Sequence, residues 1–203
     1  MNVLFLGAPG SGKGTQSKNI EKKFEIPQIS TGDLLRAETS SGSEVGEELK
    51  KIMSSGKFVN DIVLKLVSKK ITSDECQKGF ILDGFPRNLS QAMSLDKLLD
   101  DLNISIEYVF LIDVPSELII KRCVGRITCN TCGKIENEYF SDYREGDKCG
   151  EGTFVKRADD NEETVTNRLK VYAEQTEPII DFYKNKGVLH RIIGGEDGPE
   201  RLT

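Results

Sequence analysis

Several features are scarce or missing in this sequence of 203 residues. Tryptophan is absent, histidine occurs once, as His190, and no apolar run approaches the roughly 20 residues that a membrane-spanning helix needs. A single histidine argues against catalysis by a histidine acid or base. The net charge of −5, from 28 basic and 33 acidic residues, argues against a protein that coats duplex nucleic acid. These absences leave a soluble globular protein with one main domain and small insertions.

The amino terminus also shows no targeting signal. Residues 1–7 (MNVLFLG) carry no positively charged leader ahead of a short apolar run, so we expect no signal peptide. The predicted location is therefore the cytoplasm, where the five cysteines would be thiols or metal ligands rather than disulfides.

Strand-like and helix-like stretches alternate along the chain. Apolar runs typical of strands buried on both faces occupy residues 3–6, 79–82, 108–112 and 188–193. Helical patterns occupy residues 15–24, 33–55, 60–72, 88–102, 116–124 and 161–186. Asp160 and Glu163 have the spacing of a capping box at the start of the last helix. The alternation predicts an α/β fold whose parallel sheet is covered by helices on both faces.

The most specific motif is rich in glycine and follows the first predicted strand. Residues 7–15 (GAPGSGKGT) contain G-x-x-x-x-G-K, with Gly14 where the common pattern has serine or threonine, and Thr15 directly after it. Glycines let backbone N–H groups converge on phosphate oxygens, the helix start adds positive potential, and Lys13 adds a formal charge. The motif predicts a nucleoside triphosphate site. The alternative is a glycine-rich turn without a ligand, which the strand before it and the helix after it disfavour.

Further clusters indicate what receives the phosphoryl group. Residues 30–36 (STGDLLR) place a hydroxyl and an arginine just over one helical turn apart. Residues 83–87 (DGFPR) follow a buried strand, where ligands bind in open α/β sheets, and Gln91 lies one turn beyond. Six of the nine arginines fall in such clusters, and planar guanidinium groups suit phosphate recognition. Taken singly, each arginine is equally compatible with a surface ion pair, Asp83 with a turn residue, and Gln91 with an exposed helix residue.

Taken together, these segments resemble the adenylate kinase family, of the long-lid bacterial type, over nearly the whole chain. The resemblance rests on GAPGSGKGTQ, STGDLLR, GFILDGFPRNLSQA, RCVGR and RADDNEET, all in the family's order. It implies a P-loop kinase fold with a five-stranded parallel sheet flanked by helices. The core would comprise residues 1–29, 60–126 and 160–203, with a helical AMP-binding insertion at 30–59 and a small cysteine-rich lid at 127–159. It also implies a monomer that converts ATP and AMP into two ADP with Mg²⁺ and binds neither nucleic acid nor membranes.

The resemblance further implies roles for individual residues. The catalytic set would be Lys13, Arg87, Arg122, Arg126, Arg157 and Arg168. ATP would contact Gly10, Ser11, Gly12, Lys13, Gly14, Thr15, Arg122, Arg126, Ile135, Glu136 and Gly198. AMP would contact Thr31, Arg36, Lys57, Phe58, Val59, Gly84, Phe85, Pro86, Arg87, Gln91, Arg157 and Arg168. Gln91 would read the adenine edge of AMP, and Asp83 would orient the waters around Mg²⁺.

The lid stretch also predicts a structural zinc knuckle. Two residues separate Cys129 from Cys132, and sixteen more separate Cys132 from Cys149. Thiolates at this spacing are typical of a zinc site that braces an insert too small for its own core.

The fourth zinc ligand is left open by the sequence. The family pattern implies a cysteine or aspartate three residues after Cys149, where this chain has Gly152. Glu151 is the preferred fourth ligand and Asp147 the runner-up, and a vestigial site without metal is the remaining alternative.

Other functions compete with this interpretation. A related kinase acting on UMP, CMP or GMP is disfavoured by the pairing of Thr31 with Gln91 and by the long lid. A non-catalytic nucleotide sensor is disfavoured by the arginines around two phosphate sites, and a zinc-knuckle nucleic-acid adaptor by the negative charge. Phosphoryl transfer to a phosphate that is already anionic needs no general base, which fits the single histidine. Because water must be excluded from the reaction, we expect residues 30–59 to close over AMP and residues 127–159 over ATP.

Overall fold

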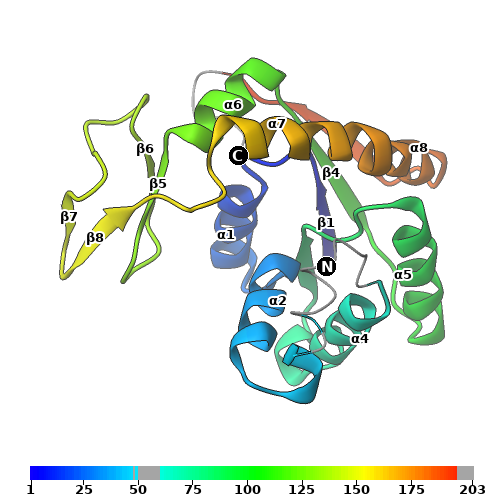
Figure 1. Ribbon diagram of the computed structural model, residues 1–203. Coiled ribbons are helices and arrows are strands. Elements are labelled where there is room, and N and C mark those ends of the chain that lie inside the picture. Colours follow the sequence, from blue (N-terminus) through cyan, green and yellow to red (C-terminus); the bar gives the residue numbers. More distant parts are fainter. Residues whose placement is uncertain (48, 50–59, 196–203) are drawn as a thin grey trace.

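The computed structural model describes residues 1–47, 49 and 60–195. Its centre is a five-stranded sheet in the order β2-β3-β1-β4-β9, and every neighbouring pair of strands is parallel (Figure 1). The strands are β1 (Asn2–Leu6), β2 (Gln28–Ser30), β3 (Phe80–Asp83), β4 (Tyr108–Asp113) and β9 (Leu189–Ile193). This confirms the predicted parallel sheet, including the four strands read from apolar runs. The strand β2 had no such run, because it has three residues and only Ile29 is buried.

Helices connect the strands and cover both faces of the sheet. They are α1 (Lys13–Phe24), α2 (Thr31–Ser40), α4 (Asn60–Ile71), α5 (Leu89–Asp101), α6 (Ser116–Val124), α7 (Glu162–Val171) and α8 (Glu177–Asn185). A short 3₁₀ turn, Asp74–Cys76, precedes β3. No helix in the described ranges is both long and apolar enough to cross a membrane.

Two predicted helices differ from the structure. The helix predicted over residues 161–186 is interrupted by a π-helical turn, Tyr172–Thr176, which ends two positions before Pro178 in α8. Proline has no N–H group to continue the hydrogen-bond ladder, so the turn absorbs the break. The helix predicted over residues 33–55 has its first segment in α2, which ends at Ser40, just before Gly42 with a positive φ of 71°.

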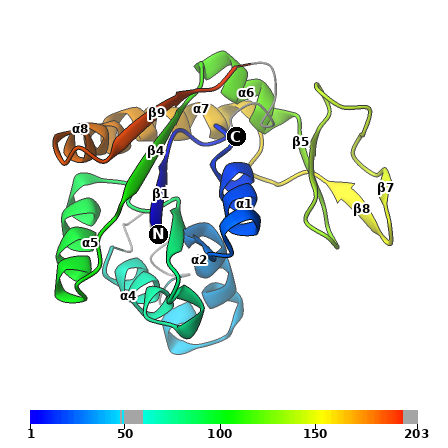
Figure 2. The ribbon, with the colours of Figure 1, turned by 180° about the vertical axis from the view of Figure 1, so that it is seen from behind.

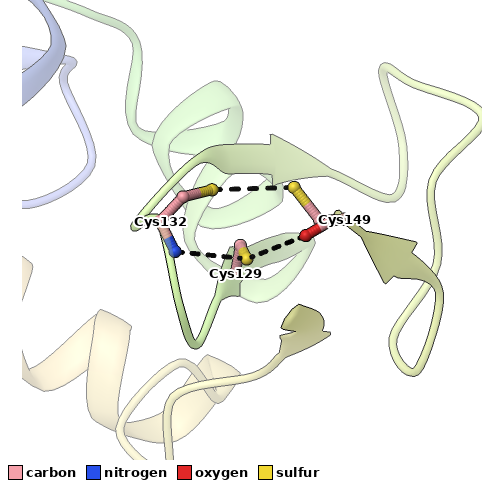
Figure 3. A group of neighbouring side chains, drawn as sticks. All are labelled: Cys129, Cys132 and Cys149. Carbon is pink, nitrogen blue, oxygen red and sulfur yellow. Dashed lines mark hydrogen bonds between the residues drawn. The ribbon is translucent and has the colours of Figure 1, made fainter. Parts of the chain in front are cut away.

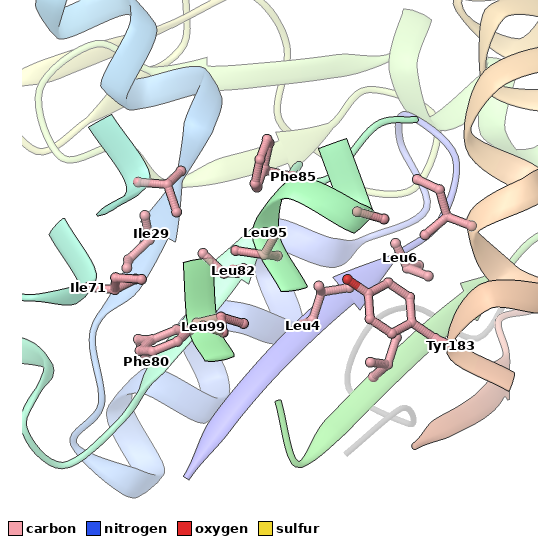
Figure 4. Close-up of a cluster of buried hydrophobic side chains, with 14 of the residues drawn as sticks. Leu4, Leu6, Ile29, Ile71, Phe80, Leu82, Phe85, Leu95, Leu99 and Tyr183 are labelled. Carbon is pink, nitrogen blue, oxygen red and sulfur yellow. The ribbon is translucent and has the colours of Figure 1, made fainter. Parts of the chain in front are cut away.

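The alternating side chains of β1 divide the core into two parts. Leu4 and Leu6 point to the face covered by α4, α5 and α8, where Phe80, Leu82 and Leu95 join them (Figure 4). Val3 and Phe5 point to the face covered by α6 and α7. Both sets are almost fully buried, as a strand between two helical layers requires. The loop after β1 and the end of β3 lie side by side at the carboxyl edge of this covered sheet.

A second, smaller sheet extends from one side of the molecule (Figures 1 and 2). It has four antiparallel strands in the order β6-β5-β8-β7. Its strands are β5 (Arg126–Cys129), β6 (Ile135–Asn137), β7 (Lys148–Cys149) and β8 (Gly152–Val155). Only Ile127, Cys129 and Phe154 form its buried cluster. The chain enters this sheet from the end of α6 and leaves it ahead of α7 (Figure 1).

The predicted capping box at α7 is wrong. Asn161 caps this helix, because its side-chain oxygen accepts a hydrogen bond from Thr164 N at 2.9 Å. Asp160 is instead buried against Arg126, which is the stronger interaction for a carboxylate with no exposed side-chain surface.

Candidate active site

The glycine-rich loop between β1 and α1 is held in a conformation that only glycine adopts easily. Gly10 and Gly12 have φ angles of 81° and 102°. A methyl group on Gly10 would also lie 2.3 Å from the sulfur of Cys123, so α6 supports the loop from behind. This close approach leaves the backbone N–H groups of the loop and of the first turn of α1 free of bulky side chains.

The side chain of Lys13 curls back over this loop. Its Nζ donates hydrogen bonds to the carbonyl oxygens of Gly7 at 2.7 Å and Ala8 at 2.9 Å. Burial lowers the pKa of Lys13 to about 8, and the negative charge of Asp83 opposes that decrease. The loop thus holds a desolvated ammonium group that gains from any added negative charge.

Asp83 lies at the carboxyl end of β3, next to the glycine-rich loop. Its Oδ2 atom would lie 3.4 Å from a Cβ built on Gly14, and it accepts a hydrogen bond from Gln28 Nε2 at 2.9 Å. Burial raises the pKa of this carboxyl group, against the charge of Lys13 and the hydrogen bond from Gln28, which lower it. Gln28 was not predicted, and its position before residues 30–36 gave no signal of this contact.

A second group of predicted residues gathers beyond the end of β3. Thr31 Oγ1 donates to the carbonyl oxygen of Gly84 at 2.9 Å, and Arg87 Nε donates to the same oxygen at 2.8 Å. Gln91 is buried, and its Oε1 accepts from the backbone N–H of Arg87 at 2.7 Å. Thr176 Oγ1 donates to the carbonyl oxygen of Arg87 at 2.8 Å, which ties this turn to the π-helical segment. Phe85 and Pro86 complete the turn, and the bond between them is cis.

Two of the predicted arginines are paired with neighbouring aspartates. Arg126 binds Asp160 through two bonds, Nε to Oδ2 at 2.8 Å and Nη2 to Oδ1 at 2.5 Å. Burial lowers the pKa of Arg126, but the hydrogen bond and the charge of Asp160 outweigh it and raise the pKa overall. Arg168 binds Asp159, and that pair is far more exposed, at 41% and 46% of the side-chain surfaces. Asp159 was not predicted as a site residue, although it lies in the segment RADDNEET (residues 157–164).

Arg122 links the loop to the end of the described chain. Its Nη1 donates to Ser11 O at 3.5 Å and its Nη2 to Gly195 O at 2.6 Å. Burial lowers the pKa of this guanidinium. Arg157 is exposed between β8 and α7.

The charged groups of this region act on one another. The charges of Asp83, Arg87 and Arg126 all affect the pKa of Lys13. Those of Arg126, Arg168 and Lys13 all affect the pKa of Cys123, the thiol behind the loop. The fold therefore brings together basic residues from four separate segments of the chain around the glycine-rich loop.

The remaining predicted residues lie elsewhere or outside the described part. Ile135 and Glu136 are on β6 of the small sheet, where Glu136 pairs with Lys134 at 2.9 Å. Arg36 lies on α2. Lys57, Phe58, Val59 and Gly198 fall outside the described residues.

The three predicted zinc ligands of the small sheet lie together (Figure 3). The sulfur atoms of Cys129, Cys132 and Cys149 all lie within 4.8 Å of one another, and those of Cys132 and Cys149 are 3.6 Å apart. Backbone N–H groups of Cys132 and Thr131 lower the pKa of Cys129 to about 7. Two sulfurs bound to one tetrahedral zinc at about 2.3 Å lie roughly 3.8 Å apart, so the cluster has the dimensions and the soft donors for this metal.

Comparisons with known proteins agree with this geometry. A family model described as adenylate kinase matches residues 5–188. A protein of Thermodesulfovibrio yellowstonii named adenylate kinase is 50% identical over 198 residues, which cover 96% of this chain and 92% of that protein. The proteins of the same name from Nitrosococcus oceani and Archaeoglobus fulgidus are 46% and 45% identical, over 97% of this chain and 93% and 92% of their own lengths.

Proposed function

This chain belongs to the adenylate kinase family, and its reaction is the transfer of a phosphoryl group from ATP to AMP; we propose how its residues carry it out. The observation that carries the proposal is the desolvated ammonium of Lys13, held in a glycine-rich loop and facing the charges of Asp83, Arg87 and Arg126. Such a site is built to hold polyphosphate and to neutralise its charge.

ATP binds along the loop between β1 and α1. The backbone N–H groups of residues 10–15 hold its phosphates, and Lys13 leaves the carbonyl groups of Gly7 and Ala8 for phosphate oxygens. Arg122 and Arg126 add charge from α6 and β5. Ile135 and Glu136 contact ATP from the small sheet, and Gly198 contacts its adenine.

AMP binds beside the turn that follows β3. Thr31, Arg36 and Arg87 bind AMP, together with residues 57–59, and Gln91 reads the adenine. The hydrogen bonds that Gly84 O accepts from Thr31 and Arg87 support this assignment, because they fix both side chains against one rigid turn. The preference for AMP over other monophosphates depends on Gln91.

The transfer step needs positioning and charge rather than a base. The acceptor oxygen belongs to a phosphate and carries no proton that must be removed at neutral pH, so no general base is required. Arg157 and Arg168 stabilise the charge that spreads over the phosphoryl oxygens. Mg²⁺ supplies further neutralisation when bound with ATP, and the hard carboxylate oxygens of Asp83 fit the role of holding its waters.

While nucleotides are absent, Asp160 binds Arg126 and Asp159 binds Arg168. Phosphate groups compete with Asp160 for Arg126 and with Asp159 for Arg168. The pairs keep both cations near the site, and the Arg126 pair does so without leaving a buried charge uncompensated.

The two insertions act as moving covers over this site. Residues 30–59 close over AMP and residues 127–159 over ATP, so that phosphoryl transfer outcompetes hydrolysis. Solution scattering with and without a bisubstrate inhibitor tests this movement, which predicts a smaller radius of gyration in the complex. Equal dimensions in both states contradict it.

The small sheet carries a structural zinc ion. Cys129, Cys132 and Cys149 hold it, and the fourth ligand remains a prediction because Glu151 and Asp147 lie outside the compact group of sulfurs. The ion fastens a sheet whose buried cluster has only three residues. Metal analysis of the purified protein measures it, and less than about half an equivalent of zinc refutes the site.

One assay tests the activity and the assignments together. ADP formation from ATP is measured with AMP, UMP, CMP and GMP as acceptors. We propose that the enzyme acts as a monomer in the cytoplasm. We expect rapid turnover with AMP alone, and a loss of several orders of magnitude in Lys13→Ala and Arg87→Ala. His190→Gln serves as the matched control that retains activity. Equal turnover with another monophosphate overturns the assignment of the acceptor site.

A further inference from the structure

The zinc site of the small sheet offers three protein ligands rather than four. Structural zinc is almost always four-coordinate, and Cys129, Cys132 and Cys149 supply three thiolates. We propose that the fourth position is taken by a water molecule, which a small thiol replaces. This inference rests on the proposed zinc site.

The residue at the expected fourth-ligand position has no side chain to offer. Gly152 pairs with Cys149 in the hairpin of β7 and β8, across a turn in which Gly150 has a φ of 61°. A Cβ atom on Gly152 would lie 2.6 Å from Cys129 Sγ and 2.6 Å from Thr131 Oγ1. The glycine therefore lets the hairpin lie directly against the sulfur of Cys129, and no ligand enters from this direction.

The nearby carboxylates are not part of the compact group of ligand atoms. Asp147 accepts a hydrogen bond from Arg144 N at 2.6 Å, which fixes it in the turn before β7. Glu151 is exposed at the tip of the hairpin. Within residues 126–155, all of which the structure describes, the group of possible metal ligands contains the three cysteines alone.

The open side of the cluster faces solvent. Cys129 is buried at 2% exposure, whereas Cys132 is exposed and Cys149 is partly exposed. A ligand therefore approaches past Cys132 and Cys149. Four thiolates are a common ligand set for structural zinc, so a thiol is the chemical class that best completes the site. In the exchange the thiol gives its proton to solvent, its sulfur binds the metal, and the water leaves.

Cobalt substitution of the full chain tests the proposal. Co²⁺ in the site gives thiolate-to-metal absorption that grows with the number of bound sulfurs. We expect added 2-mercaptoethanol to raise this absorption by about one third, the ratio of four thiolates to three. The wild-type spectrum staying unchanged overturns the proposal, because the thiol then does not enter the fourth position.

Two variants sharpen the result. Gly152→Cys restores a fourth sulfur, and we expect it to show the four-thiolate spectrum without added thiol and no response to it. Glu151→Gln is expected to respond like the wild type. A response that appears only in Glu151→Gln overturns the proposal and identifies Glu151 as the fourth ligand. The Glu151 comparison stands even where Gly152→Cys fails to fold. Absence of any cobalt absorption refutes the zinc site itself and with it this inference.

Discussion

The adjacent carboxylates Asp159 and Asp160 allow a controlled test of how burial determines the value of an ion pair. Each binds one arginine, Asp159 with Arg168 and Asp160 with Arg126. Asp160 has no exposed side-chain surface and Arg126 has 20%, whereas the side chains of the other pair are 41% and 46% exposed. The perturbation is Asp160→Asn, with Asp159→Asn as its matched control.

The structure sets the expected magnitudes. Removal of one partner from a buried ion pair costs about 3–5 kcal/mol, and the partial exposure of Arg126 places Asp160→Asn near the lower value. For a chain of this size, 1 kcal/mol shifts Tm by about 2–4 °C, so Asp160→Asn should lower Tm by roughly 6–12 °C. An exposed pair contributes about 0–1 kcal/mol, so Asp159→Asn should lower Tm by less than about 4 °C.

Thermal unfolding followed by circular dichroism, without nucleotide, measures both shifts. A third protein, Asp160→Leu combined with Arg126→Met, removes both charges and should recover most of the lost stability, because no unpaired charge then remains buried. Equal Tm shifts in the two single variants would refute the reasoning, since burial would then not distinguish the pairs. A double variant less stable than Asp160→Asn would refute it as well.

Three further predictions concern the nucleotide site. The pKa of Lys13 is lowered to about 8 in the free protein, and bound phosphates raise it, so ATP binding should take up protons at about pH 8.5 and weaken as pH rises further. Calorimetry in two buffers of different ionisation enthalpy measures this uptake, with AMP as the control ligand; no uptake with ATP contradicts it. Gln28→Leu removes the donor to Asp83 Oδ2 and should raise the Mg²⁺ concentration needed for half-maximal rate about tenfold, at unchanged KM for AMP. An unaltered Mg²⁺ dependence separates Gln28 from the site. His190→Gln should change turnover by less than about twofold, because His190 is exposed on β9 beside the rings of Tyr108 and Phe110; loss of activity with an intact fold contradicts this.

The parts of the fold that were predictable have a signal within a short stretch of sequence. The strands β1, β3 and β4 have apolar centres because they are buried between helical layers. The strand β9 lies at the edge of the sheet and is largely exposed, and its signal is the run of apolar residues around His190 and Arg191. The strand β2 was not predicted, because three residues show no periodicity. Its pairing with β3 joins residues more than 50 positions apart. The break between α7 and α8 depends on Pro178, whose effect on a helix is either a kink or an end, and the sequence does not say which.

In the candidate site, too, contiguous motifs were predictable and contacts between distant residues were not. The glycine-rich loop is contiguous, so its residues, spacing and setting were all legible in residues 7–15. The contact of Gln28 with Asp83 spans 55 residues and leaves no local trace. Asp160 was interpreted as a helix cap because its neighbours fit that pattern, while its actual partner, Arg126, is 34 residues away.

The cysteine cluster proposed to bind zinc was predictable only in part. Cysteine spacing identified three thiols that the structure brings within 4.8 Å of one another. The packing of Gly152 against Cys129 depends on the turn between β7 and β8, which spacing alone does not specify.

The small sheet can be changed in sequence separately from the main sheet. Its first strand begins directly after Gly125 and its last strand ends at Val155. A hydrogen bond from Glu138 N to Gly125 O at 2.8 Å joins the sheet to the end of α6. Its buried cluster shares no residue with the two clusters of the main sheet. It is therefore a separate packing unit: residues 127–155 can be exchanged without repacking the buried clusters of the main sheet, provided that Arg126 is kept for its pair with Asp160.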